Sequence, residues 1–214
     1  MSLNHQSLQQ LKQMGFVDQL PAPPQRIITK LSGTEKSGKS HFALTGPPPI
    51  LYFSIDIGTE GVVEKFQQQG KSVLVYELRI QKNQAAIEYK NQWDRLSQLL
   101  DVALKVGQGT IVFDTWTEMY ELARLAHFGG RLDKVMPQEY PIVYSDLREK
   151  IRRIYDSPMN AVLITKMARD YNTKQLEEKG FQDTGYLVQV NARMERLDEA
   201  GKPSQFVCQV MDCR

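Results

Sequence analysis

Short apolar runs and longer amphipathic segments alternate along this chain. The apolar runs are nearly continuous and rich in β-branched and aromatic residues, which is typical of strands in a parallel sheet covered on both faces. They occupy residues 26–31, 50–55, 72–78, 109–115 and 161–165. Between them, apolar residues recur at helical spacing over residues 62–66, 84–106, 117–122 and 145–155. This alternation predicts an α/β domain with a mostly parallel central sheet flanked by helices.

Two further strand-like runs follow near the C-terminal end of the sequence. Residues 186–194 and 205–211 flank a polar segment at 197–204, in which Gly201 and Pro203 suit a hairpin loop. We therefore expect a C-terminal β-hairpin.

The N-terminal residues have a different pattern. Leu8, Leu11 and Met14 recur at helical spacing in a Gln-rich segment and predict a short amphipathic helix. Residues 21–24, Pro-Ala-Pro-Pro, then impose an extended backbone. We expect an arm over residues 1–25 and a single domain over residues 26–214. Two roles of the arm stay open: a loosely attached terminus, or a segment that docks on a neighbouring subunit.

The connection after the first strand matches G-x-x-x-x-G-K-[ST] at every fixed position. Such a loop wraps around phosphates with its backbone N–H groups, its lysine reaches the β- and γ-phosphates, and its Ser or Thr hydroxyl ligates Mg²⁺. A strand precedes the loop, and a short helix over residues 40–44 follows it. This context favours a site for a nucleoside triphosphate over a Gly/Ser/Lys surface loop. The residues expected to bind the nucleotide are Gly33, Thr34, Glu35, Lys36, Ser37, Gly38, Lys39, Ser40 and His41.

A carboxylate ends the strand at 109–115. Asp114 follows the apolar run Ile111-Val112-Phe113, which has the form of a Walker B strand. Taken alone, Asp114 suits the N-cap of the helix at 117–122. Its occurrence together with the phosphate loop favours the other interpretation, in which Asp114 and Ser40 hold Mg²⁺.

Two more carboxylates follow the strand at 50–55. Asp56 and Glu60 lie among flexible glycines at the carboxyl end of that strand, where open α/β sheets bind their ligands. They suit a catalytic acid that activates water or orients Mg²⁺. They also suit a turn followed by a helix start. The spacing leaves both interpretations open.

The strand at 161–165 ends in Thr165 and Lys166, a polar pair placed to sense a γ-phosphate. Residues 167–185 then show no clean period, which predicts a functional or mobile loop. Within it, the positive charges of Arg169, Lys174 and Lys179 occur together with the stacking faces of Tyr171 and Phe181, as single-stranded nucleic acid requires. The neighbouring Glu177-Glu178 pair weakens that interpretation.

The composition limits the class of protein and identifies no further site residue. The 214 residues are 41% hydrophobic, enough for one domain with a full core. A net charge of +2 is too small for bulk attraction to nucleic acid, so a DNA site must come from local clusters. Only Cys208 and Cys213 are present, which excludes a disulfide framework and a four-cysteine zinc site. Without a long apolar run or a signal-peptide pattern, we expect a cytoplasmic protein that does not enter a membrane.

The order of these motifs resembles the short RecA-like ATPases of bacteriophages, some of which are assigned to single-strand annealing. The likeness runs from residue 27 to residue 214. It rests on the phosphate loop, residues 56–61, 111–115 and 163–166, and most specifically on Phe-Ala-Leu-Thr at 42–45 followed by the strand and turn at 50–66.

The resemblance implies a RecA-like P-loop core that binds ATP and Mg²⁺ through Lys39, Ser40 and Asp114. It also implies single-stranded DNA at the loop after Lys166, a single-strand binding protein as partner, a homo-oligomeric ring or filament with a basic residue acting in trans, and the cytoplasm of a bacterial host. One position departs from RecA itself, whose catalytic Glu falls near Gly58 here. Asp56 or Glu60 would have to replace it, so hydrolysis is expected to be slow or stimulated by DNA.

Three functions therefore compete. The first is an ATPase that binds single-stranded DNA and supports recombination or strand annealing. The second is a small-molecule or nucleotide kinase on the same phosphate-loop scaffold. It would need an arginine-rich lid, for which the basic residues after Lys166 are too sparse. The third is an accessory for DNA loading or packaging that binds ATP as a switch with little turnover.

Overall fold

The computed structural model describes residues 5–17, 25–56, 61–81, 84–170 and 175–213. The strands are β1 (Ile28–Gly33), β2 (Ile50–Ser54), β3 (Val73–Glu77), β4 (Thr110–Asp114), β5 (Asn160–Arg169), β6 (Leu176–Glu178), β7 (Val190–Leu197) and β8 (Gln205–Cys213). The helices are α1 (His5–Gln13), α2 (Lys39–Ala43), α3 (Val62–Gln68), α4 (Ala86–Leu104), α5 (Trp116–Phe128), α6 (Pro141–Tyr155) and α7 (Thr184–Leu187). Two 3₁₀ turns, η1 (Gly129–Lys134) and η2 (Pro137–Glu139), connect α5 to α6.

A single sheet organises the described part of the chain, in the order β3-β2-β4-β5-β1-β7-β8 with β6 paired to β5. All neighbours are parallel except β5–β6 and β7–β8. The predicted α/β class and mostly parallel sheet are therefore confirmed. Because β1 and β4 both pair with β5, the end of the phosphate-loop strand lies close to the end of the strand that carries Asp114.

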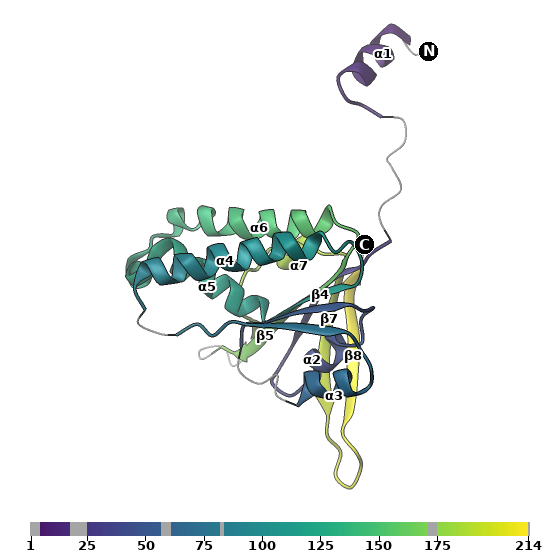
Figure 1. Ribbon diagram of the computed structural model, residues 1–214, viewed down its shortest axis with the longest axis vertical. Helices are drawn as coiled ribbons and strands as arrows, with labels where there is room; N and C mark the ends of the chain where they lie inside the picture. Colours follow the sequence, from purple (N-terminus) through teal and green to yellow (C-terminus); the bar gives the residue numbers. More distant parts are fainter. Residues whose placement is uncertain (1–4, 18–24, 57–60, 82–83, 171–174, 214) are drawn as a thin grey trace.

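Helices cover the two faces of the sheet unequally. Figure 1 shows α4, α5 and α6 together on one face and the short α2 and α3 on the other. The larger core lies under the long helices and contains the fully buried Phe113 and Trp116. The smaller core lies under α2 and α3 and contains the fully buried Leu31, Leu44 and Ile50. The continuously apolar strands are explained by these two cores, since both faces of the sheet are covered.

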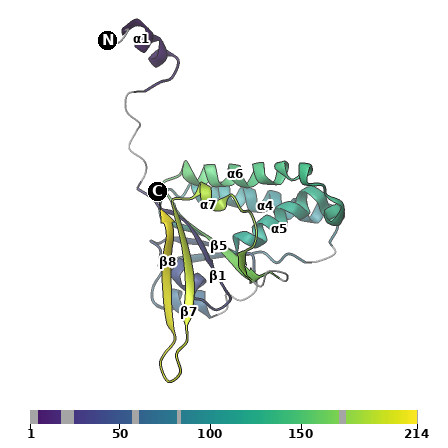
Figure 2. The same ribbon diagram turned by 180° about the vertical axis from the view of Figure 1, so that it is seen from behind.

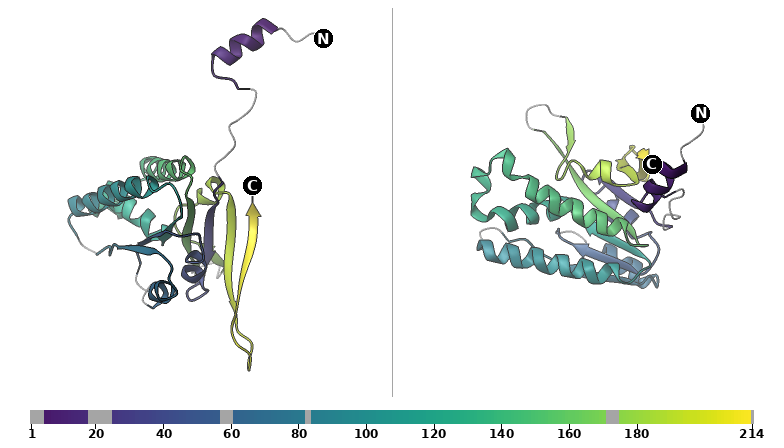
Figure 3. Two further views of the ribbon diagram at one scale, coloured as in Figure 1. Left: turned by 45° about the vertical axis from the view of Figure 1, so that its right-hand side comes forward. Right: turned by 90° about the horizontal axis from the view of Figure 1, so that it is seen from above.

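The predicted C-terminal hairpin is present as β7 and β8. Figure 2 shows this pair beside β1, and Figure 3 shows its tip extending past the other strands. Every residue of β8 is exposed, whereas Ala192 and Met194 of β7 are buried in the smaller core. The hairpin therefore adds one antiparallel edge to the parallel sheet on the side of the phosphate loop.

Three boundaries differ from the sequence-based expectations. The segment at 167–185 is not a structureless loop, because β5 continues to Arg169 and pairs with β6, and α7 follows. Helix α6 begins at Pro141 rather than near 145, since proline is tolerated in a first helical turn. Strand β7 begins at Val190 rather than at 186, because α7 occupies Thr184–Leu187. Pairing with β6 explains the first of these differences and the short helix α7 explains the third, so contacts beyond the local sequence overrode a weak local pattern in both.

Arg26 ties the segment before β1 to the body of the fold. Its side chain is 8% exposed, and its guanidinium stacks 4.5 Å from the centre of the Tyr155 ring. Its Nε donates hydrogen bonds to the carbonyls of Tyr155 (3.0 Å) and Ser157 (2.9 Å). A cation that satisfies carbonyls at the end of α6 is favourable for the helix dipole. The chain is thereby tied to the body of the fold two residues before β1.

No helix in the described ranges combines the length and the apolar character that crossing a bilayer requires.

Candidate nucleotide-binding site

The phosphate loop connects β1 to α2, as the sequence pattern requires. A Cβ atom on Gly33 would lie 2.6 Å from both the Met194 carbonyl oxygen and the Ser37 hydroxyl, so only glycine fits there. Gly38 has φ of +90°, a conformation that other residues rarely adopt. The buried Ser37 hydroxyl donates a 2.8 Å hydrogen bond to the Thr34 carbonyl and closes the loop on itself. These contacts explain why small residues occupy the fixed positions.

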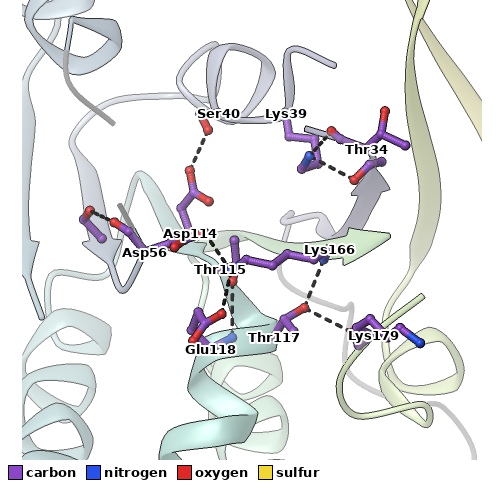
Figure 4. A network of polar contacts seen from close by, with 12 residues as sticks. Thr34, Lys39, Ser40, Asp56, Asp114, Thr115, Thr117, Glu118, Lys166 and Lys179 are labelled. Carbon is purple, nitrogen blue, oxygen red and sulfur yellow. Dashed lines mark hydrogen bonds and ion pairs between the residues drawn. The ribbon is translucent and has the colours of Figure 1, made fainter. Parts of the chain in front are cut away.

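Lys39 directs its ammonium group across the loop. Its Nζ donates to the carbonyl of Gly33 at 3.0 Å and to that of Thr34 at 2.6 Å (Figure 4). Burial lowers the pKa of Lys39 below its ordinary value, although the charges of Asp114 and Glu35 oppose that shift. A partly desolvated ammonium gains more than an exposed one from contact with an anion. Lys39 is therefore placed to bind a phosphate held by this loop.

Asp114 is the polar centre of the site. It is 6% exposed, and its Oδ2 accepts a 2.6 Å hydrogen bond from the Ser40 hydroxyl and a second one from the Tyr52 hydroxyl. The N-cap of α5 is instead Thr115, whose Oγ1 accepts from the N–H of Glu118 at 3.2 Å. The helix-cap interpretation of Asp114 is thus wrong. Its carboxylate faces the phosphate loop (Figure 4).

The oxygen donors of Ser40 and Asp114 fit Mg²⁺. This ion prefers hard oxygen ligands and is commonly held by one or two carboxylates together with water and substrate phosphates. Within the described ranges, no group of three or more His, Cys, Asp and Glu side chains is arranged to hold a metal. A carboxylate and a hydroxyl side by side suit a cation that arrives with phosphate, because phosphate oxygens and water can supply the other ligands of Mg²⁺.

Lys166 lies between two carboxylates. Its Nζ is 2.8 Å from Asp56 Oδ2, and it also pairs with Glu118 Oε1. Burial lowers the pKa of Lys166, but the hydrogen bonds and charges of Asp56 and Glu118 outweigh burial and raise that pKa above its ordinary value. Lys166 therefore stays charged. The structure thus places Asp56, which follows β2, beside Lys166, which pairs with Gly33 at the carboxyl end of β1.

The other predicted site residues lie apart or outside the described ranges. Thr165 is 2% exposed and lines a separate cavity of about 370 Å³ with Glu177 and Glu178, so it does not act as a pair with Lys166. Arg169 is exposed at the end of β5, opposite Leu176 of β6, rather than in a loop. The remaining predicted residues Glu60, Tyr171 and Lys174 fall outside the described residues.

A cavity of about 760 Å³ adjoins the phosphate loop. Its walls include Phe42 of α2, Val62 of α3 and, from the hairpin, Met194, Phe206 and Cys208. His41 also lines it, and its Nε2 is 3.2 Å from Lys65 Nζ. Apolar and aromatic walls beside a phosphate site suit a planar base, which can stack on Phe206.

Sequence reasoning missed three residues of this region. Tyr52 is the single tyrosine of β2, and a buried tyrosine normally needs a hydrogen-bond partner. Glu118 follows Asp114 by four positions in the first turn of α5. Phe206 reaches the loop only through the pairing of β8 with β7, so no local pattern could have identified it.

Comparisons with known proteins support the fold. No protein-family model and no curated protein matches the chain. Among solved structures, a prototypical ATPase from the type III secretion system of pathogenic bacteria is similar, with a TM-score of 0.56 and 15% sequence identity. The match covers 79% of this chain and 51% of the ATPase chain, so this chain spans about half the length of that protein. The likeness confirms the predicted RecA-like α/β fold.

Proposed function

We propose that this chain is a Mg²⁺-dependent ATPase that binds ATP at residues 33–41. The observation that carries the proposal is the 2.6 Å hydrogen bond between Ser40 and Asp114, directly in front of a complete phosphate loop. The shared fold with a secretion ATPase supports it. Ser40 and Asp114 are 74 positions apart, so no local sequence pattern brings them together. A cation bound to the phosphates of a nucleotide would use both side chains as ligands.

The proposed roles follow from the contacts. The loop N–H groups and Lys39 hold the β- and γ-phosphates. Mg²⁺ at Ser40 and Asp114 would neutralise charge on the phosphate oxygens. Asp56 is the candidate acceptor of the proton from the attacking water, because it lies at the same edge of the sheet as Asp114. Water attacks the γ-phosphorus, the bond to the β–γ bridging oxygen breaks, and ADP leaves with that electron pair.

We propose further that the protein binds single-stranded DNA and supports recombination or strand annealing. The resemblance to phage RecA-like ATPases and the exposed cation of Arg169 support this part. Arg169, together with Tyr171 and Lys174, would contact the single-stranded DNA. A homo-oligomeric ring or filament, acting beside a single-strand binding protein, fits the same resemblance.

The test is a steady-state assay of phosphate release from ATP with Mg²⁺ or with EDTA, each with and without single-stranded DNA. The proposal predicts slow release that requires Mg²⁺ and rises when DNA is added. Mg²⁺-dependent release that DNA leaves unchanged would contradict the DNA-linked part. Phosphate transfer to an added small-molecule or nucleotide acceptor would identify a kinase instead. Absence of phosphate release under all four conditions would contradict the proposed ATPase activity.

A further inference from the structure

The first turn of α5 holds Lys166 by both its backbone and its side chain. The Lys166 N–H donates a 3.0 Å hydrogen bond to Thr117 Oγ1, and that hydroxyl donates to the Lys179 carbonyl at 3.1 Å. The Lys179 N–H in turn donates to the Lys166 carbonyl at 2.9 Å. Glu118, the next residue of the turn, pairs with the Lys166 ammonium (Figure 4).

The position of Glu118 constrains the direction of that ammonium. A lysine ammonium has three N–H donors. Asp56 and Glu118 accept two of them from different elements, one after β2 and one on α5. With two donors fixed at separate anchors, the direction of the third is fixed as well. A side chain that would otherwise sample many rotamers is thereby held in one arrangement.

This cluster lies within electrostatic reach of the phosphate loop. The charges of both Lys166 and Asp56 act on Lys39, the lysine of the loop. The pairing of β1 with β5 also brings the phosphate loop close to Lys166, since Gly33 at the start of the loop lies opposite Lys166. A terminal phosphate held by Lys39 would therefore lie near the ammonium of Lys166.

We infer that Glu118 is a positioning residue that holds Lys166 for contact with the terminal phosphate, so that the site prefers a nucleoside triphosphate over a diphosphate. This inference rests on the proposed nucleotide binding. A diphosphate lacks the group that Lys166 would meet and gains nothing from its orientation. Glu118 would therefore affect the ratio of the two affinities rather than both affinities equally.

A purely structural role makes a different prediction. A carboxylate in the first turn of a helix stabilises that helix through its dipole, and Glu118 also joins α5 to β5. If Glu118 did only this, its replacement would lower the unfolding temperature and leave the preference for triphosphate unchanged.

The test measures the dissociation constants of Mg·ATP and Mg·ADP by titration calorimetry, on wild type, Glu118→Gln and Glu118→Asp. Glutamine keeps the size and removes the charge; aspartate keeps the charge and shortens the reach. In Glu118→Gln the ratio of the ADP dissociation constant to the ATP dissociation constant should fall about tenfold. This is the size of effect expected when the charge-assisted hydrogen bond from Lys166 to the terminal phosphate is lost. The affinity for ADP should stay near that of wild type, and Glu118→Asp should be intermediate. If one variant does not fold, the other carries the test.

Glu121→Gln is the matched control, because Glu121 lies one turn further along α5 and pairs with Arg124. It should leave the ratio unchanged. A wild-type ratio in folded Glu118→Gln or Glu118→Asp would overturn the inference and leave the proposed function intact. A wild-type protein that binds neither nucleotide would overturn both.

Discussion

Ser40 and Asp114 are joined by a 2.6 Å hydrogen bond although 74 positions separate them in the sequence. The contact exists because β1 and β4 both pair with β5, and because the loop after β1 folds back over the end of the sheet. The hydroxyl of one motif and the carboxylate of the other thus meet at one point.

Tyr52 is expected to orient Asp114 for its cation. Burial and the neighbouring Asp114 raise the pKa of Tyr52 well above its ordinary value, so the hydroxyl remains a donor. Tyr52→Phe removes one of the two hydrogen bonds to Asp114 Oδ2. Loss of a residue that hydrogen-bonds to a metal ligand typically weakens metal affinity by about 10–100-fold. The measurement is the Mg²⁺ concentration that half-saturates ATP binding.

Tyr89→Phe provides the control for this variant. Tyr89 is equally buried, but its hydroxyl donates to the Gln81 carbonyl rather than to a site residue. Its Mg²⁺ requirement should match that of wild type. An unchanged requirement in Tyr52→Phe would show that Asp114 does not depend on Tyr52.

Gly33→Ala should disrupt the phosphate loop. The added Cβ would lie 2.6 Å from the backbone oxygen of Met194, so the loop must shift. Overpacking of this kind costs about 1–3 kcal/mol. We expect a lower unfolding temperature and a loss of ATP affinity. Gly70→Ala is the control, because Gly70 also has positive φ, at +82°, but no atom of the described residues lies within 4 Å of the added Cβ. Wild-type ATP affinity in Gly33→Ala would contradict the expected fit.

Phe206 is expected to stack on the base of the nucleotide. Loss of one aromatic platform under a base costs about 1–3 kcal/mol, or roughly 5- to 150-fold in affinity. Phe206→Ala should therefore weaken ATP binding while binding of inorganic triphosphate stays constant. Val207→Ala, the next residue on the opposite face of β8, should change neither. Equal losses for ATP and inorganic triphosphate would place the effect in the phosphate loop instead.

Arg169 and Lys174 are expected to contact DNA phosphates. Each lost contact should reduce the slope of log affinity against log salt by about one. The double variant Arg169→Ala, Lys174→Ala should therefore bind an oligonucleotide more weakly and with a shallower salt dependence. Lys202→Ala, in the connection between β7 and β8, is a control of the same charge type. A slope equal to that of wild type in the double variant would rule out these two contacts.

Local sequence patterns were sufficient to predict the parallel sheet and the position of the phosphate loop. The loop motif fixes residue types at consecutive positions, and the strand and helix on either side follow from apolar runs and Pro47 to Pro49. The C-terminal hairpin followed from two strand-like runs around a polar segment. These features depend on neighbours in sequence.

The missed features depend on neighbours in space. Tyr52 contacts Asp114 because β2 pairs with β4. Glu118 contacts Lys166 because α5 packs against β5. The extension of β5 to Arg169 requires β6, a strand of three residues with no pattern of its own. No periodicity within a single segment encodes such contacts.

The most direct test of the central claim compares the binding of Mg·ATP by wild type and by Lys39→Ala in titration calorimetry. Lys90→Ala, which removes a surface lysine of α4 paired with Asp94, serves as the control. A hydrogen bond to a charged group contributes about 1.5–3 kcal/mol, so the account predicts roughly a 10- to 150-fold loss for Lys39→Ala and wild-type binding for Lys90→Ala. Equal ATP affinity in Lys39→Ala and wild type would contradict the assignment of residues 33–41 as the nucleotide site.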